Sequence, residues 1–395
     1  MTLIQKIYGD LKGDKAIWLI VVLLGVFSIL TVYSATGSQA YKLHGGNTSY
    51  YLVQQVLFIS LGLLVTYICY QLHYMQYLRF APLLLFISVP LLLYTIVFGQ
   101  EVNGASRWFT IPWINRTIQT SDFAKIALIL YVARSLSLKQ EVIKDLRSAF
   151  LPIIVPVVFV CALIAPDDLS TSVLLFMTCL MMMFIGRVSL KYIALLLLLG
   201  AIVFGLIVAL GHFFPETVRL DTWTSRVNSF LDPVGADNFQ VNESKVAIAN
   251  GGWLGLGPGN SIQRNILPYA YADFIFAIIC EEYGLTGGIF IMGLYLWLLI
   301  RCIVMVTKCP KTFGAILAMG LCLNIVIQAF ANIAVSVNLV PVTGLNLPLI
   351  SMGGTSVVFT CMSLGVILSV SKFVEEAHFD NTRLAKIEAR DANSI

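Results

Sequence analysis

The chain has 395 residues, of which 58% are hydrophobic and only 12% are charged, and its mean hydropathy is +0.86. Soluble domains carry about 25% charged residues, so this composition excludes a water-soluble enzyme, a nucleic-acid-binding protein and a secreted disulfide scaffold. The net charge of +4 is too small to indicate a polyanionic partner. The composition predicts a polytopic membrane protein.

Ten apolar runs are long enough, or nearly so, to cross a bilayer, which takes about 20 residues per helix. The first run is too long for a signal-peptide core and is expected to be retained as a span. We predict an all-α integral membrane protein with about ten transmembrane helices in one polytopic domain, residues 1–372, followed by a charged tail, 373–395. The runs are 16–35, 51–71, 80–98, 121–137, 150–165, 170–186, 189–212, 273–301, 313–337 and 350–371.

The basic residues predict the orientation, because Lys and Arg are enriched in cytoplasmic loops. Most of the 25 lysines and arginines fall in the loops that are cytoplasmic if the N-terminus is inside. An even number of spans then places the tail inside as well, so both termini are expected to be cytoplasmic. Three segments are left on the outer face: 99–120, a large extracytoplasmic loop between the seventh and eighth spans at 213–272, and 338–349.

Cysteine and histidine give no sign of a metal site or a disulfide framework. Seven of the eight cysteines lie in or beside apolar runs, none lies in the large outer loop, and the four histidines are far apart. We therefore expect no metal held by these residues.

Arg107 is the first candidate functional residue, in the segment Asn-Gly-Ala-Ser-Arg-Trp at 103–108. Its guanidinium could bind a phosphate with two hydrogen bonds, or could anchor the segment at the membrane interface. Asp122 and Lys125 follow at the start of the fourth span, with a spacing that puts both on one helix face. They form either a local ion pair or a cavity wall on which Lys125 meets an anionic lipid headgroup.

Asp167 and Asp168 follow a proline at the outer end of the fifth span. They either cap the next helix or, as a carboxylate pair, contribute to a divalent cation site. Further on, residues 251–260 read Gly-Gly-Trp-Leu-Gly-Leu-Gly-Pro-Gly-Asn. This is neither a Walker loop nor a dinucleotide fingerprint. We expect tight turns on the outer face, which are either flexible or suited to close approach of the backbone to a ligand.

Asp273 begins the eighth predicted span. Its carboxylate either caps the helix or acts as a general base that takes a proton from a substrate hydroxyl at the outer membrane surface. Glu281 and Glu282 lie about 12 Å deeper at helical rise. Carboxylates at that depth usually have partners, so a structural polar cluster competes with a catalytic role. Residues 341–354 contain prolines and glycines that interrupt helix, which is typical of backbone that lines a cavity.

Taken in order, these segments resemble those of the SEDS (shape, elongation, division and sporulation) family of membrane peptidoglycan glycosyltransferases. The resemblance covers residues 16–372 and depends on several blocks, whose order and spacing are specific together. Residues 257–261, Gly-Pro-Gly-Asn-Ser, are more similar to the division member than to the elongation member. The blocks are 103–108, 121–125, 168–171, 226–244, 251–263, 267–284 and 341–356.

The resemblance implies polymerisation of lipid II, an undecaprenyl-diphosphate-linked disaccharide-pentapeptide, on the outer face of the bacterial cytoplasmic membrane at the division septum. It implies as partners a class B penicillin-binding protein (an FtsI-like transpeptidase), divisome proteins and membrane lipid. No cofactor is evident, although a divalent cation (Mg²⁺ or Mn²⁺) would suit the diphosphate. Asp273 matches the family's essential aspartate. Substrate-binding positions are implied at Lys125, Asp122, Arg107, Gln240, Ser244, Gln263, Ser351 and Gly354, with Glu281, Glu282 and Asp168 as secondary candidates.

The sequence departs from the family pattern near its implied centre. Tyr269, Tyr271 and Ala272 stand where Glu, His and Thr are common, and Asp122 is one methylene shorter than the usual glutamate. Other functions remain open: a flippase that moves the same lipid, an elongation polymerase, or a scaffold that recruits a transpeptidase. A flippase needs a polar path across the membrane, and the deep charges lie toward the outer half, which favours the enzyme.

Overall fold

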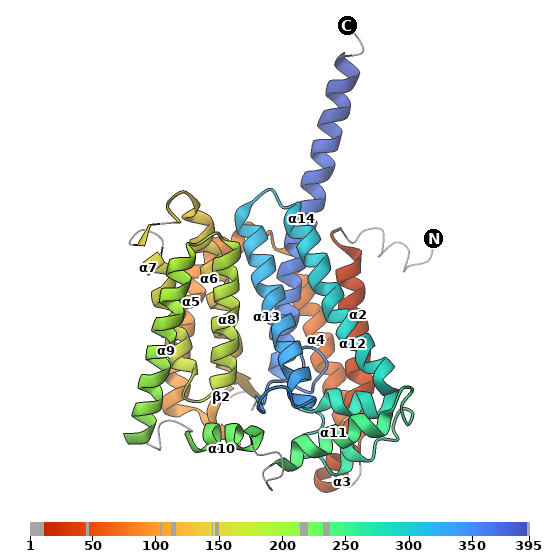
Figure 1. The fold of residues 1–395 in the computed structure, drawn as a ribbon. Helices are drawn as coiled ribbons and strands as arrows, with labels where there is room; N and C mark the ends of the chain where they lie inside the picture. Colours follow the sequence, from red (N-terminus) through yellow and green to blue (C-terminus); the bar gives the residue numbers. More distant parts are fainter. Residues whose placement is uncertain are drawn as a thin grey trace.

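The computed structural model describes residues 12–44, 47–102, 105–111, 116–143, 145–146, 150–213, 220–231 and 238–392. Within these ranges the side chains of 38, 42–44, 100–102, 105–107, 110–111, 116, 220 and 378–392 are not described. Long helices stand side by side in one bundle, and shorter elements collect at one end of it (Figure 1).

Seven of the described helices are long and apolar enough to cross a membrane. Three more helices stand beside them at the positions of the fourth, fifth and sixth predicted spans. All ten predicted runs therefore coincide with helices, while the count of ten spans stays a prediction. The seven are α2 (Lys15–Ala35), α4 (Ser49–Gln71), α5 (Tyr74–Phe98), α9 (Leu190–Phe213), α12 (Ile275–Thr307), α13 (Thr312–Ser336) and α14 (Thr355–Ala392), and the three are α6 (Thr120–Leu138), α7 (Leu151–Ile164) and α8 (Leu169–Ile185).

The first outer segment contains a small sheet, so the all-α prediction was wrong there. The antiparallel strands β1 (Gln100–Val102), β2 (Ala105–Ile111) and β3 (Arg116–Gln119) lie in the order β1-β2-β3. Trp108 pairs with Gln119 and Thr110 pairs with Thr117. Residues 108–111 and 117–118 are aromatic or β-branched and fit a pleated, half-buried surface. The expected outer loop is therefore partly ordered as a hairpin that ends directly at α6.

The large outer segment also contains regular structure. It holds the helices α10 (Leu220–Leu231) and α11 (Phe239–Gly251) and the 3₁₀ turn η4 (Gln263–Asn265). These elements lie at the same end of the bundle as the sheet and the short helix α3 (Gly37–His44) (Figure 1). The three predicted outer segments therefore meet at one end, which we call the outer end.

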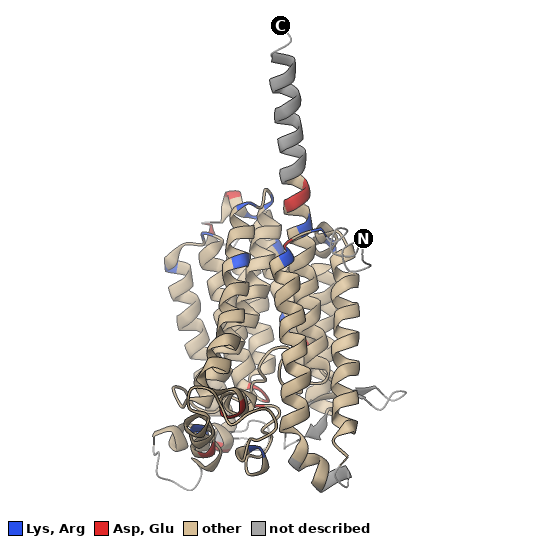
Figure 2. Ribbon diagram, turned by 90° about the vertical axis from the view of Figure 1, so that its right-hand side faces the viewer, with Lys and Arg blue, Asp and Glu red and all other residues tan. Residues whose placement is uncertain are grey.

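The opposite end is held by charged and polar contacts. Asp14, the N-cap of α2, pairs with Arg301 Nη2 at 2.7 Å, and its backbone N–H donates to Ser371 Oγ at 2.7 Å. Figure 2 shows that lysines and arginines gather at this end, where α14 leaves the bundle. α14 runs unbroken to Ala392, so the predicted boundary at 372 falls inside a helix.

α14 packs closely against α4 through small residues. An ideal Cβ at Gly365 would lie 2.6 Å from the Thr66 backbone oxygen, and one at Gly62 would lie 2.6 Å from Cys361 Sγ. Small residues let membrane helices approach backbone to backbone. This contact between the two helices, which we call the seam, fixes the position of α14 against α4.

α6 is surrounded by other helices. Most of its side chains are buried, including the polar ones at its outer start. It packs mainly against α5 and α13, with α7 and α8 beside it. The helix therefore contacts protein instead of lipid, which explains how it can carry charged side chains.

α12 is broken at Gly284, where the glycine-rich segment after α11 packs against it. Gly284 has φ +71°, and the backbone N–H groups of Leu285 and Thr286 donate to the carbonyls of Gly252 and Trp253 at 2.9 and 3.3 Å. An ideal Cβ at Gly255 would lie 2.2 Å from the Glu282 backbone oxygen. These glycines approach the backbone of α12 closely, while an approach to a ligand, one of the two predicted alternatives, stays a prediction.

Candidate functional site

A cavity of about 440 Å³ opens at the outer end between the helix ends and outer segments. Of the predicted site residues it gathers Asp122, Lys125, Asp168, Asp273 and Gly354. The wall combines α4, the sheet, α6, α8, α10, α13 and the two irregular segments before α12 and α14. Its other lining residues are Gln54, Phe58, Trp108, Thr117, Gln119, Thr171, Arg226, Tyr269, Tyr271, Ala272, Gln328, Gly344, Leu345, Asn346, Met352, Gly353, Thr355 and Ser356.

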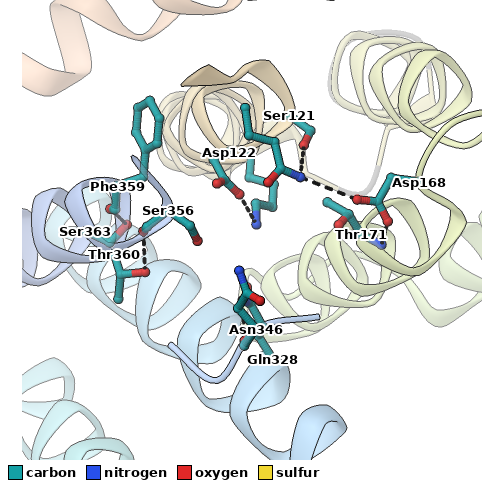
Figure 3. A network of polar contacts seen from close by, with 12 residues as sticks. Ser121, Asp122, Asp168, Thr171, Gln328, Asn346, Ser356, Phe359, Thr360 and Ser363 are labelled. Carbon is teal, nitrogen blue, oxygen red and sulfur yellow. Dashed lines mark hydrogen bonds and ion pairs between the residues drawn. The ribbon is translucent and has the colours of Figure 1, made fainter. Parts of the chain in front are cut away.

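Asp122 and Lys125 form an ion pair in the cavity wall. Lys125 Nζ lies 2.7 Å from Asp122 Oδ1, and the two side chains are only 8% and 5% exposed. The ion pair of the first predicted alternative is present, and Lys125 also lines the cavity, while its contact with an anionic headgroup stays a prediction. Figure 3 shows the pair on α6, facing polar side chains of α8, α13 and α14 across a common space. Asp122 Oδ2 is buried without a hydrogen-bond partner among the described residues.

Asp168 is the N-cap of α8, as one of the two predicted alternatives requires. Its Oδ1 accepts from the Thr171 backbone N–H at 3.1 Å. Gln119 Nε2, at the end of β3, lies 3.5 Å from Asp168 Oδ2 and 3.1 Å from Ser121 Oγ (Figure 3). This cap fixes the position of the Asp168 carboxyl group in the cavity wall. The amide of Gln119 links the sheet to α6 and α8.

Asp273 lies in the cavity wall just ahead of α12. The helix begins at Ile275 with Phe274 in the N-cap position, so Asp273 stands one residue before the cap. Its backbone carbonyl accepts from Asn332 Nδ2 of α13 at 2.7 Å. Its Oδ2 lies 3.9 Å from the ideal Cβ of Gly344, and Arg226 Nη2 lies 3.6 Å from the same point. The carboxylate thus faces the space around Gly344, close to a guanidinium.

The irregular segment before α14 is held to the segment before α12. Ser351 Oγ donates to the Ala272 carbonyl at 2.6 Å, and the Met352 backbone N–H donates to the Tyr271 carbonyl at 3.0 Å. Gln328 Nε2 of α13 donates to the Asn346 carbonyl at 2.9 Å. Ser351 therefore supports the cavity wall from behind and is not among its lining residues, and its implied substrate contact stays a prediction.

Tyr269 and Tyr271 form an aromatic corner of the cavity. Their ring centroids are 6.3 Å apart at 65°, and Tyr269 has a left-handed φ of 55°. Burial raises the pKa of Tyr271 to about 12, so its hydroxyl stays neutral at physiological pH. The same two residues also line a second space of about 220 Å³ beside Gln39 and Arg264. Tyr269 and Tyr271 therefore stand between two neighbouring spaces.

Glu281 and Glu282 lie outside the cavity and have structural partners. Glu281 accepts hydrogen bonds from Ser261 Oγ and from the Gln263 backbone N–H, the latter at 3.2 Å. The Glu282 carboxylate accepts a hydrogen bond from Ser34 Oγ of α2. Ser34 Oγ in turn accepts from Arg264 Nη1 at 3.1 Å. Of the two predicted alternatives for these acids, the structural polar cluster is the arrangement observed.

Three further implied positions lie away from the cavity lining. Ser244 Oγ of α11 donates to the Ser336 carbonyl at 2.8 Å and is fully buried. Gln263 is buried under the Glu281 carboxylate, and Gln240 lies half-buried on α11. Arg107 is in β2 next to the cavity residue Trp108, but its side chain lies outside the described residues.

Several cavity residues were not predicted from the sequence. Arg226 and Gln119 come from segments that look like ordinary amphipathic or extended chain, and Gln328 is an amide in the apolar helix α13, as is Asn332 behind the cavity wall. Only the amides carried a usable signal, because a polar side chain in a membrane helix usually has a partner or a function.

Comparison with known proteins supports this description. Residues 14–376 match the family model for the cell cycle proteins FtsW, RodA and SpoVE, and the chain belongs to this family. It is 32% identical to the probable peptidoglycan glycosyltransferase FtsW of Trichlorobacter lovleyi, over 99% of this chain and 100% of that protein. It is 33% identical to the stage V sporulation protein E of Bacillus subtilis, over 91% and 97%.

Two solved structures share the fold. One, described as "Structural coordination of polymerization and crosslinking by a peptidoglycan synthase complex", has a TM-score of 0.69 at 24% identity and covers 92% of this chain and 98% of that one. The other is the rod shape determining protein RodA of Thermus thermophilus, with a TM-score of 0.65 at 22% identity, covering 92% and 98%. These identities establish similarity of fold alone.

Proposed function

We propose that this protein is a peptidoglycan glycosyltransferase that polymerises lipid II during septal cell-wall synthesis. Support comes from family membership and from the relatives named as peptidoglycan glycosyltransferases. The single structural observation that carries the proposal is the outer cavity, which holds Asp273 on one wall and the Asp122–Lys125 pair on another. That pairing suits a sugar hydroxyl that loses a proton and a diphosphate that leaves.

Asp273 is proposed as the general base. It stands in the cavity wall at the outer end of α12, where it would receive the proton of the attacking 4-hydroxyl. The new bond joins that oxygen to the anomeric carbon, and the bond from this carbon to the diphosphate breaks. Lys125 is proposed to stabilise the leaving diphosphate, since an ammonium in a buried wall interacts strongly with an anion.

A divalent cation has no obvious protein cage here. Among the described residues no cluster of three or more His, Cys, Asp or Glu side chains could hold a metal, and Asp122 and Asp168 already have partners. We propose that any Mg²⁺ or Mn²⁺ is held mainly by the substrate diphosphate. No step of the reaction is assigned to it.

We propose that the outer end faces away from the cytoplasm of the bacterial inner membrane, at the septum. The lysines and arginines at the opposite end favour this orientation (Figure 2). With ten spans, both termini are then cytoplasmic. A class B penicillin-binding protein is the proposed partner, because the similar complex is described as coordinating polymerisation and crosslinking.

Translocation of the same lipid is the competing function. A separate space of only about 20 Å³ lies between α6, α13 and α14, where Asn324 and Ser363 line it together with the Asp122–Lys125 pair. A volume of that order accommodates about one water molecule. This shape favours an enzyme that works at one face over a transporter.

The test is polymerisation of fluorescent lipid II by purified protein, with and without the cognate class B penicillin-binding protein, resolved on a gel. Asp273→Asn should make no polymer, whereas Asp221→Asn, a matched change of an exposed acid on α10, should behave as wild type. Polymer at the wild-type rate from Asp273→Asn would overturn the general base. Translocation of labelled lipid in vesicles without polymer would favour the flippase.

A further inference from the structure

Trp253 and Leu254 project from the outer end without covering neighbours. They are 71% and 82% exposed, and Leu256 is 42% exposed. The chain carries no charged residue from 246 to 263. Large apolar side chains in an uncharged segment are unusual on a surface that meets water. Their exposure therefore indicates that this surface contacts an apolar or interfacial environment.

The backbone under these side chains is fixed in place. An ideal Cβ at Gly251 would lie 1.9 Å from the Cys280 backbone oxygen, and one at Gly284 would lie 2.2 Å from the Trp253 backbone oxygen. The N–H groups of Leu256 and Gly257 donate to the carbonyls of Glu281 and Glu282 at 2.9 and 3.0 Å. Trp253 and Leu254 are therefore held at a set height along α12.

That height matches the outer boundary of the hydrocarbon layer. At about 1.5 Å per residue, 20 helical residues span a bilayer core of about 30 Å. Counting from Arg301, which pairs with Asp14 at the basic end, 20 residues lead back to Glu281. The Trp253 carbonyl accepts from the Thr286 backbone N–H at 3.3 Å. Thr286 lies five residues, or about 7 Å, to the hydrocarbon side of Glu281 and so near the boundary.

The exposed surface also continues the flank of α12 that faces outward. Below the glycine segment, Leu285, Ile289 and Ile300 are 39%, 54% and 57% exposed on this helix. Tryptophan is enriched where the hydrocarbon meets the headgroups, because its ring is apolar and its N–H is polar. Continuity with a lipid-facing flank and the calculated height favour lipid over a protein partner.

We infer that residues 253–256 form a membrane-interface anchor, inserted into the outer leaflet at the level of the headgroups and fixed to α12 by its glycines. The anchor is connected to the cavity through Glu281, which binds residues 261–263, the turn before the wall that carries Asp273. It thereby sets the height of that wall relative to the bilayer.

The anchor is tested with a fluorophore in the full chain. A single cysteine is introduced by Leu254→Cys in a Cys309→Ser background, because the other seven native cysteines are buried. It is labelled with the polarity-sensitive dye NBD. The protein is reconstituted in vesicles of phosphatidylethanolamine and phosphatidylglycerol that carry nitroxide quenchers at headgroup depth or deep in the acyl chains.

Two positions serve as controls. Ile289→Cys on the flank of α12 should report the acyl region. Leu339→Cys is an apolar site that is 71% exposed, but it follows the largely buried α13 and should report water. We expect the 254 label to emit at shorter wavelength than the 339 label and to be quenched most by the headgroup nitroxide. A 254 label that iodide quenches and lipid nitroxides do not would overturn the anchor and favour a protein partner.

A label-free measurement covers the case in which Leu254→Cys disturbs the segment. The fluorescence difference between wild type and Trp253→Phe isolates Trp253 from the other five tryptophans. Lipids brominated near the headgroup should quench this difference more than lipids brominated near the terminal methyl. A difference signal that neither lipid quenches would contradict insertion. Because neither measurement involves lipid II, a failure of the proposed enzymatic function would leave the result unchanged.

Discussion

Asn332 joins Asp273 to the segment before α14. Its Nδ2 donates to the carbonyl of Asp273 and to the carbonyl of Leu345, each at 2.7 Å, from a position that is 1% exposed. One buried amide on α13 thus holds two cavity walls that are far apart in the sequence. The position of the proposed base depends on a residue that does not face the substrate.

Asn332→Ala should therefore reduce polymerisation strongly without removing any group that contacts substrate. Loss of the hydrogen bonds leaves buried carbonyls unpaired at a cost of about 1–3 kcal/mol each, and the wall shifts. The measurement is the initial rate of lipid II polymerisation at matched protein amounts. Ser336→Ala, one turn further along α13, removes a hydroxyl that bonds to its own helix and should keep most of the rate. Equal losses in both variants would refute a specific role for Asn332.

The Asp122–Lys125 pair allows stability and activity to be separated. Lys125→Met leaves a buried, unpaired carboxylate and should destabilise the protein by about 3–5 kcal/mol. The double variant Asp122→Asn, Lys125→Met removes both charges and should recover most of the thermal stability. If Lys125 meets the diphosphate, polymerisation should stay low in the double variant. Recovery of both properties together would mean that the pair is only structural.

Glu281 should matter for the order of the outer loop. Its carboxylate accepts hydrogen bonds from the residues just before Arg264, so Glu281→Ala should loosen that turn and expose it to trypsin. Limited proteolysis should show faster cleavage after Arg264 in this variant than in wild type. Glu243→Ala, a matched change on the half-buried face of α11, should leave the cleavage rate unchanged. Unaltered cleavage in Glu281→Ala would contradict the structural role.

The close packing of α4 against α14 predicts that one added methyl group lowers the stability of the protein. Gly365→Ala would push a Cβ into the Thr66 backbone, and such overpacking typically costs about 1–3 kcal/mol. Gly293→Ala on α12 is the matched control, because an ideal Cβ there meets nothing within 4 Å. Thermal unfolding in detergent should show a lower midpoint for Gly365→Ala alone. Similar midpoints for both variants would show that the helices can separate at little cost.

Much of the bundle was predictable because lipid imposes a simple rule on long helices. Apolar runs of about 20 residues located α2, α4 and α5 well, since hydrocarbon leaves the backbone few alternatives. The sheet at 100–119 was missed because its strands are short and the segment was read only as a break between spans. Helix α6 was also predicted, although it is less apolar than the seven long helices. It can be less apolar because neighbouring helices shield it from lipid.

The candidate site was predictable only in part. Asp122, Lys125 and Asp273 stand out because charges beside apolar runs are costly, whereas Gln119 and Arg226 look ordinary until the chain folds around them. Ser244 and Ser351 do not line the cavity, and their hydroxyls bond to backbone carbonyls behind the wall, so their substrate contact stays a prediction. A sequence shows that such a hydroxyl is present, but only the packing shows whether it turns toward the cavity or toward a neighbouring carbonyl.

The burial of α6 has a consequence for how the protein is made. The chain is synthesised from its N-terminus, so α6 leaves the ribosome well before α13, one of its two main packing partners. Until then its Asp, Lys, Ser and Thr side chains have no complete protein surroundings, and lipid is a poor substitute. Until α13 is inserted, α6 must either pack against α5 alone, with Asp122 and Lys125 neutralising each other, or stay near the insertion machinery. Membrane insertion of this protein is therefore complete only when its C-terminal third has been synthesised.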